Sequence, residues 1–75
     1  MSKLPRLTCA QLTRAIERLG FVIVRQKGSH RYFRHPETGR RCIIQQHGSK
    51  VVPLGTLAHI LKATPIALDE LLAVL

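Results

Sequence analysis

Acidic residues are scarce in this sequence. Its 75 residues include four Asp and Glu against twelve Lys and Arg, which gives a formal net charge of +8 at pH 7 and a pI near 10.9. The acidic residues are scattered over three elements of the chain, at Glu17, at Glu37 and at the adjacent Asp69 and Glu70. Such scattered carboxylates argue against a two-metal nuclease. The positive charge favours nucleic acid or another anionic partner, with an anionic membrane a weaker candidate.

Cysteine is also rare. Cys9 and Cys42 can form at most one disulfide, and neither lies in the short repeated spacing of a structural zinc site. We expect both to be small buried residues. A zinc site built from Cys42, His30, His35 and His47 is the alternative. We expect no metal and no cofactor.

Long apolar runs are absent. No run approaches the roughly 20 residues of a membrane span, and the N-terminus lacks the apolar block of a signal peptide. We therefore expect a cytoplasmic protein. The length leaves room for a single domain, residues 1–75, and so small a core favours dimerisation or a bound partner.

The first element predicted is a helix that packs on a sheet. Thr8 and Gln11 have the spacing of a capping box, so the helix begins near Thr8, and Gly20 marks its C-terminal end. Its apolar residues recur with helical periodicity and form one stripe, which consists of Leu12, Ala15, Ile16 and Leu19.

Three strands are predicted next, at residues 21–27, 31–35 and 40–46. The first is apolar and β-branched at its start, the third contains Cys42, Ile43 and Ile44, and Pro and Gly in residues 36–39 indicate a turn. These segments form an antiparallel meander. Side chains alternate along a strand, so His30, Tyr32 and Arg34 share one face of the second strand and Arg31, Phe33 and His35 share the other, with Phe33 in the core.

Two further helices complete the predicted α+β fold. Residues 54–62 carry a helical stripe, and the Thr64-Pro65 pair interrupts it. A short C-terminal helix follows, with Pro65 in its first turn and a leucine stripe. The helices cover one face of the sheet and leave the other open to a partner.

Residues 26–35 contain the side chains best suited to chemistry. Cations that neutralise phosphates, a Gly-Ser turn, a tyrosine that stacks on bases and an imidazole that titrates near neutral pH lie close together. Positive charge is concentrated in the same region: between Arg25 and Lys50 there are seven of the twelve Lys and Arg and one acid, Glu37. This pattern favours a nucleic-acid-binding sheet over a merely solvated face.

The sequence closely resembles the HicA toxins over nearly its whole length. The resemblance lies in Arg25-Gln26-Lys27-Gly28-Ser29-His30, in His47, and in Gly55-Thr56-Leu57 with Ile60-Leu61-Lys62. It implies a double-stranded-RNA-binding-domain-like fold, ribosome-independent cleavage of mRNA, a catalytic His30 and a HicB-like antitoxin. Pro65 and Ala67 depart from the family, which commonly has Gly and a capping Ser there.

The residues themselves fit metal-independent RNA cleavage. A neutral imidazole at His30 can remove the proton of a ribose 2′-hydroxyl so that the oxygen attacks the adjacent phosphorus. Lys27, Arg31 or Lys50 can stabilise the developing charge, and Ser29 or a backbone N–H can hold a phosphate oxygen. The candidates for the general acid that protonates the leaving 5′-oxygen are His47 and His35, and the alternative for each is an ordinary surface histidine. The predicted RNA-binding residues are Lys27, Gly28, Ser29, Arg31, Tyr32, Arg34, His47 and Lys50.

Two other functions fit the same sequence. A non-catalytic RNA-binding module would use the same basic sheet without needing an imidazole at position 30. A pure interaction protein would use the open face to bind another protein. Oligomeric state is open between a homodimer and a toxin–antitoxin hetero-oligomer.

Overall fold

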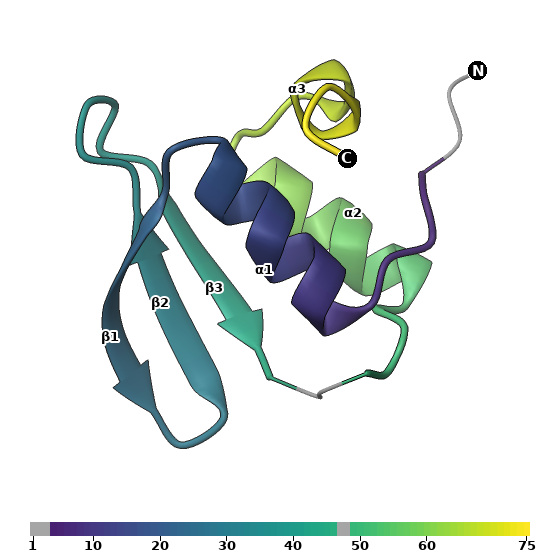
Figure 1. The fold of residues 1–75 in the computed structure, drawn as a ribbon, viewed down its shortest axis with the longest axis horizontal. Coiled ribbons are helices and arrows are strands. Elements are labelled where there is room, and N and C mark those ends of the chain that lie inside the picture. The colour runs from purple at the N-terminus through teal and green to yellow at the C-terminus, as the bar shows by residue number, and fades with distance from the viewer. Residues whose placement is uncertain (1–3, 47–48) are drawn as a thin grey trace.

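The fold is a three-stranded sheet covered on one side by helices (Figure 1). The computed structural model describes residues 4–46 and 49–75. Its elements in order are α1 (Cys9–Arg18), β1 (Val22–Lys27), β2 (His30–Arg34), β3 (Arg41–Gln45), α2 (Leu54–Ala63) and α3 (Leu68–Leu72). The sheet is antiparallel with strand order β1-β2-β3. The predicted α+β class and element order are confirmed. None of the helices described is long and apolar enough to cross a membrane.

Helix α1 begins with the predicted capping box. The Thr8 Oγ1 accepts a hydrogen bond from the Gln11 N–H at 3.1 Å, and the Gln11 Oε1 accepts one from the Thr8 N–H at 2.9 Å. Two of the unpaired N–H groups at this helix end are thereby satisfied. The chain leaves the helix through Gly20, whose φ of 99° is in the left-handed region that favours glycine.

The core lies between the helices and the inner face of the sheet, which we define as the face toward α1 and α2. Leu12 and Ile16 of α1, Leu57 of α2 and Ile44 of β3 are almost fully buried. Phe33 is 2% exposed, which confirms its predicted place in the core. All six residues of β1 are exposed, because this strand lies farthest from the helices (Figure 1).

The junction between α2 and α3 differs from the prediction. Pro65 does not lie in the first turn of the last helix: it lies three residues before Leu68, where α3 begins, and has a φ of 27°. The Thr64 N–H bonds to the Ile60 carbonyl and the Ile66 N–H to the Leu61 carbonyl, so α2 closes with a tight turn at Pro65. This turn needs a left-handed residue, whereas the proline ring favours a φ near −65°.

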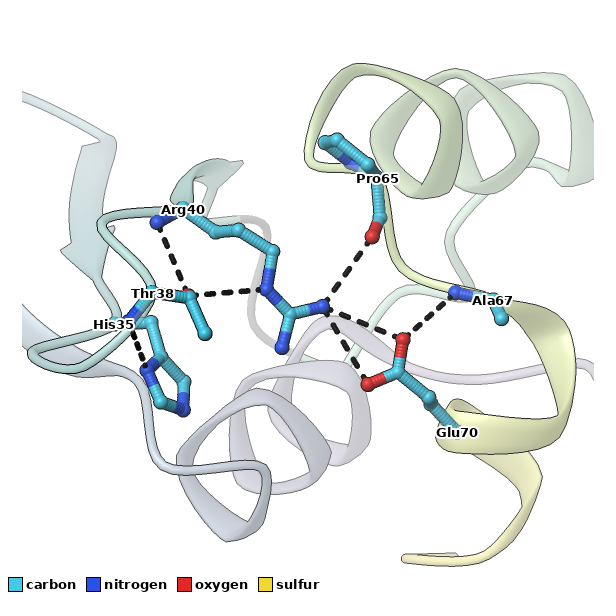
Figure 2. A network of polar contacts seen from close by, with 6 residues as sticks. All are labelled: His35, Thr38, Arg40, Pro65, Ala67 and Glu70. Carbon is cyan, nitrogen blue, oxygen red and sulfur yellow. Dashed lines mark hydrogen bonds and ion pairs between the residues drawn. The ribbon is translucent and has the colours of Figure 1, made fainter.

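A single arginine joins the β2–β3 turn to α3 (Figure 2). The Arg40 Nη1 donates to the Pro65 carbonyl at 3.2 Å and forms an ion pair with Glu70 at 3.3 Å, while its Nε donates to the Thr38 Oγ1 at 3.2 Å. The Ala67 N–H also donates to Glu70, at 3.1 Å. This N–H, together with the Arg40 guanidinium, lowers the pKa of Glu70. One carboxylate thus caps α3 and holds the distant turn.

Candidate nucleic-acid interface

The face of the sheet away from the helices, here called the outer face, carries three rows of side chains. Residues paired across neighbouring strands point to the same face, so the strand register fixes each row. The rows are Lys27–His30–Gln45, Arg25–Tyr32–Ile43 and Val22–Arg34–Arg41. His30 therefore lies between Lys27 and Gln45 at one end of the sheet. Arg34 and Arg41 lie side by side toward the other end.

A β-bulge in β1 places its two cations on the outer face. Ile23 pairs with Phe33 and points inward, so unbroken alternation would also point Arg25 and Lys27 inward. The register shifts between Ile23 and Arg25, where Val24 is the extra residue. Arg25 and Lys27 consequently reach the face of His30. Bulges of this kind commonly redirect side chains beside functional sites.

His30 is the first residue of β2 and directly follows the β1–β2 turn. Gly28 has a φ of 59°, and a side chain added there would meet no atom within 4 Å. Glycine is therefore required for its backbone conformation and not for lack of space. The Ser29 carbonyl accepts a hydrogen bond from the Gln46 N–H at 2.6 Å, which fixes the turn against the end of β3. The predicted strand start at residue 31 is one residue late.

Tyr32 forms the centre of the outer face. The Arg25 guanidinium carbon lies 5.6 Å from the centroid of the Tyr32 ring, within the range of a cation–π contact. A shallow hollow of about 410 Å³ extends from this pair toward the Arg34 row, and Val24, Arg34, Arg41 and Ile43 help to line it. The hollow thus combines an aromatic ring, apolar side chains and cations.

Other predicted RNA-binding residues lie away from this face. Arg31 pairs with Gln26 and Ile44 and points to the inner face, where it is half-buried. Its Nε is among the buried polar atoms that lack a hydrogen-bond partner in the described part of the chain. Lys50 is exposed on the segment after β3, and its carbonyl accepts the Cys9 N–H at 3.1 Å. His47 is outside the described residues.

The His35 side chain takes part in the hydrogen bonding and packing of the β2–β3 turn. Its Nδ1 accepts the N–H groups of Glu37 and Thr38, both at 3.2 Å, and its ring meets the Phe21 ring edge-on with centroids 5.3 Å apart. A Cβ on Gly20 would come within 2.9 Å of the His35 Nε2, so Gly20 is also required for close packing. This imidazole stabilises the β2–β3 turn on the face opposite His30.

The cysteines lie inside the fold as expected. Both thiols are free, with Cys9 3% and Cys42 1% exposed. Burial raises the pKa of the Cys42 thiol. Cys42 points inward and His30 outward, so the proposed zinc ligands do not converge. No three residues of the types His, Cys, Asp and Glu form a possible metal site within residues 4–46 and 49–75.

Two of the cations on the outer face, Arg25 and Arg41, are absent from the set predicted from sequence. Both belong to the basic segment, but the run Val22-Ile23-Val24 gives no sign of which residue forms the bulge. Arg41 is the first residue of β3, and its position beside Arg34 depends on the register of the hairpin. Only a correct strand pairing could have identified them.

Comparison of the sequence with models of known protein families finds a match to one family. The model of the family described as HicA toxin of bacterial toxin-antitoxin matches residues 9–66, which extend from the start of α1 to the residue after Pro65. This range includes the entire sheet and His30. A comparison with curated protein sequences found no match.

Proposed function

Because the chain belongs to the HicA toxin family, we propose that it is a ribosome-independent RNA endonuclease that cleaves mRNA with His30 as general base. The observation that carries this proposal is the row Lys27–His30–Gln45 at the open end of the outer face. An imidazole there is exposed to a polymer substrate and lies next to a cation. Four Lys and Arg side chains, Arg25, Lys27, Arg34 and Arg41, lie on the same face, and none of the paired positions of that face holds an acid.

The reaction can be written from these residues. The His30 imidazole takes the 2′-hydroxyl proton, the 2′-oxygen bonds to the adjacent phosphorus, and the bond from phosphorus to the 5′-oxygen breaks. The leaving oxygen takes a proton from a general acid, so the products are a 2′,3′-cyclic phosphate and a 5′-hydroxyl. Lys27 stabilises the charge that develops on the phosphorane. Gly28 and Ser29 let the backbone of the turn approach a phosphate oxygen.

We also propose that an acidic, HicB-like antitoxin covers the outer face of this cytoplasmic toxin. A basic face that contains exposed Val24 and Ile43 suits a partner with complementary charge and some apolar surface. Co-expression of the cognate antitoxin should restore growth to cells that express the toxin. In the purified complex, His30 should become protected from chemical modification by diethyl pyrocarbonate. A complex in which His30 stays reactive and RNA is still cleaved would contradict this mode of inhibition.

The alternative is a non-catalytic RNA-binding module. Incubation of the purified protein with RNA and a chelator separates the two functions, with the His30→Ala protein as control for contaminating nuclease. We expect cleavage by the native protein alone, with cyclic phosphate termini. If RNA is bound but neither protein cleaves it, the binding-module function is correct and the catalytic one is wrong.

A further inference from the structure

We propose that a single-stranded segment of RNA runs along the outer face of β2, with the cleaved phosphate at the His30 row and a second phosphate held by Arg34 and Arg41. This inference rests on the function proposed above and adds to it the path and strandedness of the substrate. The RNA would cross the three rows in order. Three properties of the rows support this path for the RNA: their spacing, their positive charge and the aromatic side chain of the middle row.

The spacing of the rows matches a nucleic acid backbone. His30 and Arg34 are four residues apart on β2, a distance of about 13 Å at the usual rise of a strand. An extended sugar–phosphate chain covers this length with about two nucleotides. Arg34 and Arg41 are direct partners across β2 and β3, so their guanidinium groups can hold the same phosphate.

The middle row provides a stacking platform. The Tyr32 ring is half-buried, and Arg25 lies against it at 5.6 Å. Ile43 is 51% exposed on the other side of Tyr32. A base between the two phosphate sites would therefore stack on the Arg25–Tyr32 pair, either on the guanidinium plane or on the ring face that Arg25 leaves open. Stacking of this kind binds single strands with little regard to sequence.

The same geometry disfavours a duplex. Bases of a duplex are stacked on one another and cannot lie flat on Tyr32 without being pulled out. Domains that bind double-stranded RNA contact its grooves across many base pairs, mostly through shape and phosphates. Here the cations and the tyrosine are concentrated on one open sheet face about as long as β2.

The test uses short 2′-O-methyl oligonucleotides with one unmodified ribose, so that cleavage is possible at only one position. An uncharged methylphosphonate linkage is moved along the oligonucleotide, one position at a time. For the native protein we expect a neutral linkage two nucleotides from the cleaved one, on one side only, to slow cleavage about fivefold or more. The Arg34→Gln/Arg41→Gln protein should lose this position-specific effect. Arg14→Gln, which removes an exposed cation from α1, should retain it.

The stacking site is tested by binding. We expect Tyr32→Ala to weaken binding of the single strand roughly 5- to 100-fold, and Tyr32→Phe to stay within about twofold of the native protein. Binding of a duplex of the same length should be weaker and unaffected by either change. Preferential duplex binding, equal effects of Arg14→Gln and the Arg34/Arg41 pair, or a flat methylphosphonate profile would overturn the proposed path.

The two proposals can fail separately. If the native protein cleaves the oligonucleotides but the profile is flat, the path is wrong and the catalytic function stands. If the native protein cleaves none of them, the catalytic function is wrong. The path is then decided by the same methylphosphonate series in binding assays with the His30→Ala protein.

Discussion

His30 and His35 are five residues apart and have opposite surroundings. His30 is exposed at the start of β2, and no hydrogen bond of its side chain is found in the described part of the chain. We therefore expect His30→Ala to change the free energy of unfolding by less than about 1 kcal/mol. Loss of the general base should slow RNA cleavage roughly 10²- to 10⁴-fold, with RNA affinity nearly unchanged. Thermal unfolding, cleavage kinetics and RNA titration measure the three quantities.

His35→Ala is the matched control for an imidazole in the same basic region. It removes the acceptor of two N–H groups and the contact with Phe21, so stability should fall by about 1 to 3 kcal/mol. Its cleavage rate, measured well below its unfolding temperature, should stay near the native rate. The catalytic assignment of His30 would be contradicted if His30→Ala cleaved RNA at the native rate. It would also be contradicted if His35→Ala lost cleavage while His30→Ala retained it.

At the residue scale, alternation along β2 was enough to predict much of the site. It placed His30, Tyr32 and Arg34 on one face and Phe33 in the core, because β2 is regular and has a pairing partner on each side. The same alternation argued against Arg31 as a neighbour of His30, although Arg31 was included among the RNA-binding residues. The role of His35 could not be predicted, because it depends on a turn conformation and on contact with Phe21.

Among the elements, β1 and the α2–α3 junction were the least predictable. The apolar run 22–24 is compatible with more than one alternation of inward-facing and outward-facing side chains. Only its pairing with β2 shows that Val24 is the extra residue. The position of Pro65 follows from the local turn that closes α2, which could not be predicted because proline favours a φ near −65° and not the left-handed value that this turn requires. Helix α1 was predicted well, since both its capping box and its apolar stripe are local features.

The α2–α3 junction leads to a prediction about proline. Pro65 has a φ of 27°, far from the value near −65° that its ring favours, and such backbone strain costs about 1 to 3 kcal/mol. We expect Pro65→Gly to stabilise the protein by about 1 kcal/mol, after allowing for the greater freedom of glycine in the unfolded chain. Chemical denaturation measures the change.

Pro53 provides the matched control. It precedes α2 with a φ of −55°, which suits proline. Pro53→Gly should therefore destabilise the protein, by roughly 0.4 to 1 kcal/mol. Equal destabilisation by both substitutions would show that Pro65 is not strained.

At the scale of the whole molecule, Glu70 connects α3 to the β2–β3 turn through Arg40 (Figure 2). Its pKa is lowered by the Ala67 N–H and by Arg40. The carboxylate therefore stabilises the fold above its unfolded pKa of about 4.3, and this contribution is lost as the pH falls through the lower folded pKa. Because the side chain is 41% exposed, the contribution should be modest.

The corresponding experiment compares stability at neutral and acid pH. Between about pH 5 and pH 3, the native protein should lose more stability than Glu70→Gln. Glu37→Gln, which changes an exposed carboxylate in the β2–β3 turn, should follow the native curve. Identical pH profiles for the native protein and Glu70→Gln would show that this ion pair does not couple the turn to α3.

The distribution of charge over the molecule predicts how RNA binding depends on salt. With seven Lys and Arg between Arg25 and Lys50, four of them on the outer face, we expect about four to six phosphate contacts. The logarithm of the affinity should then fall with the logarithm of the salt concentration, with a slope of magnitude about three to five. Titration of RNA against the His30→Ala protein at several salt concentrations measures this slope without cleavage.

Single substitutions locate the contacts that produce the slope. Arg41→Gln, on the outer face, should reduce its magnitude by up to about 0.7 to 1, because one cation that neutralises phosphate charge is lost. Arg14→Gln, on the exposed side of α1, removes the same charge and should leave the slope nearly unchanged. A salt-independent affinity would show that binding is not electrostatic. Equal reductions by the two variants would show that net charge, and not the outer face of the sheet, attracts the RNA.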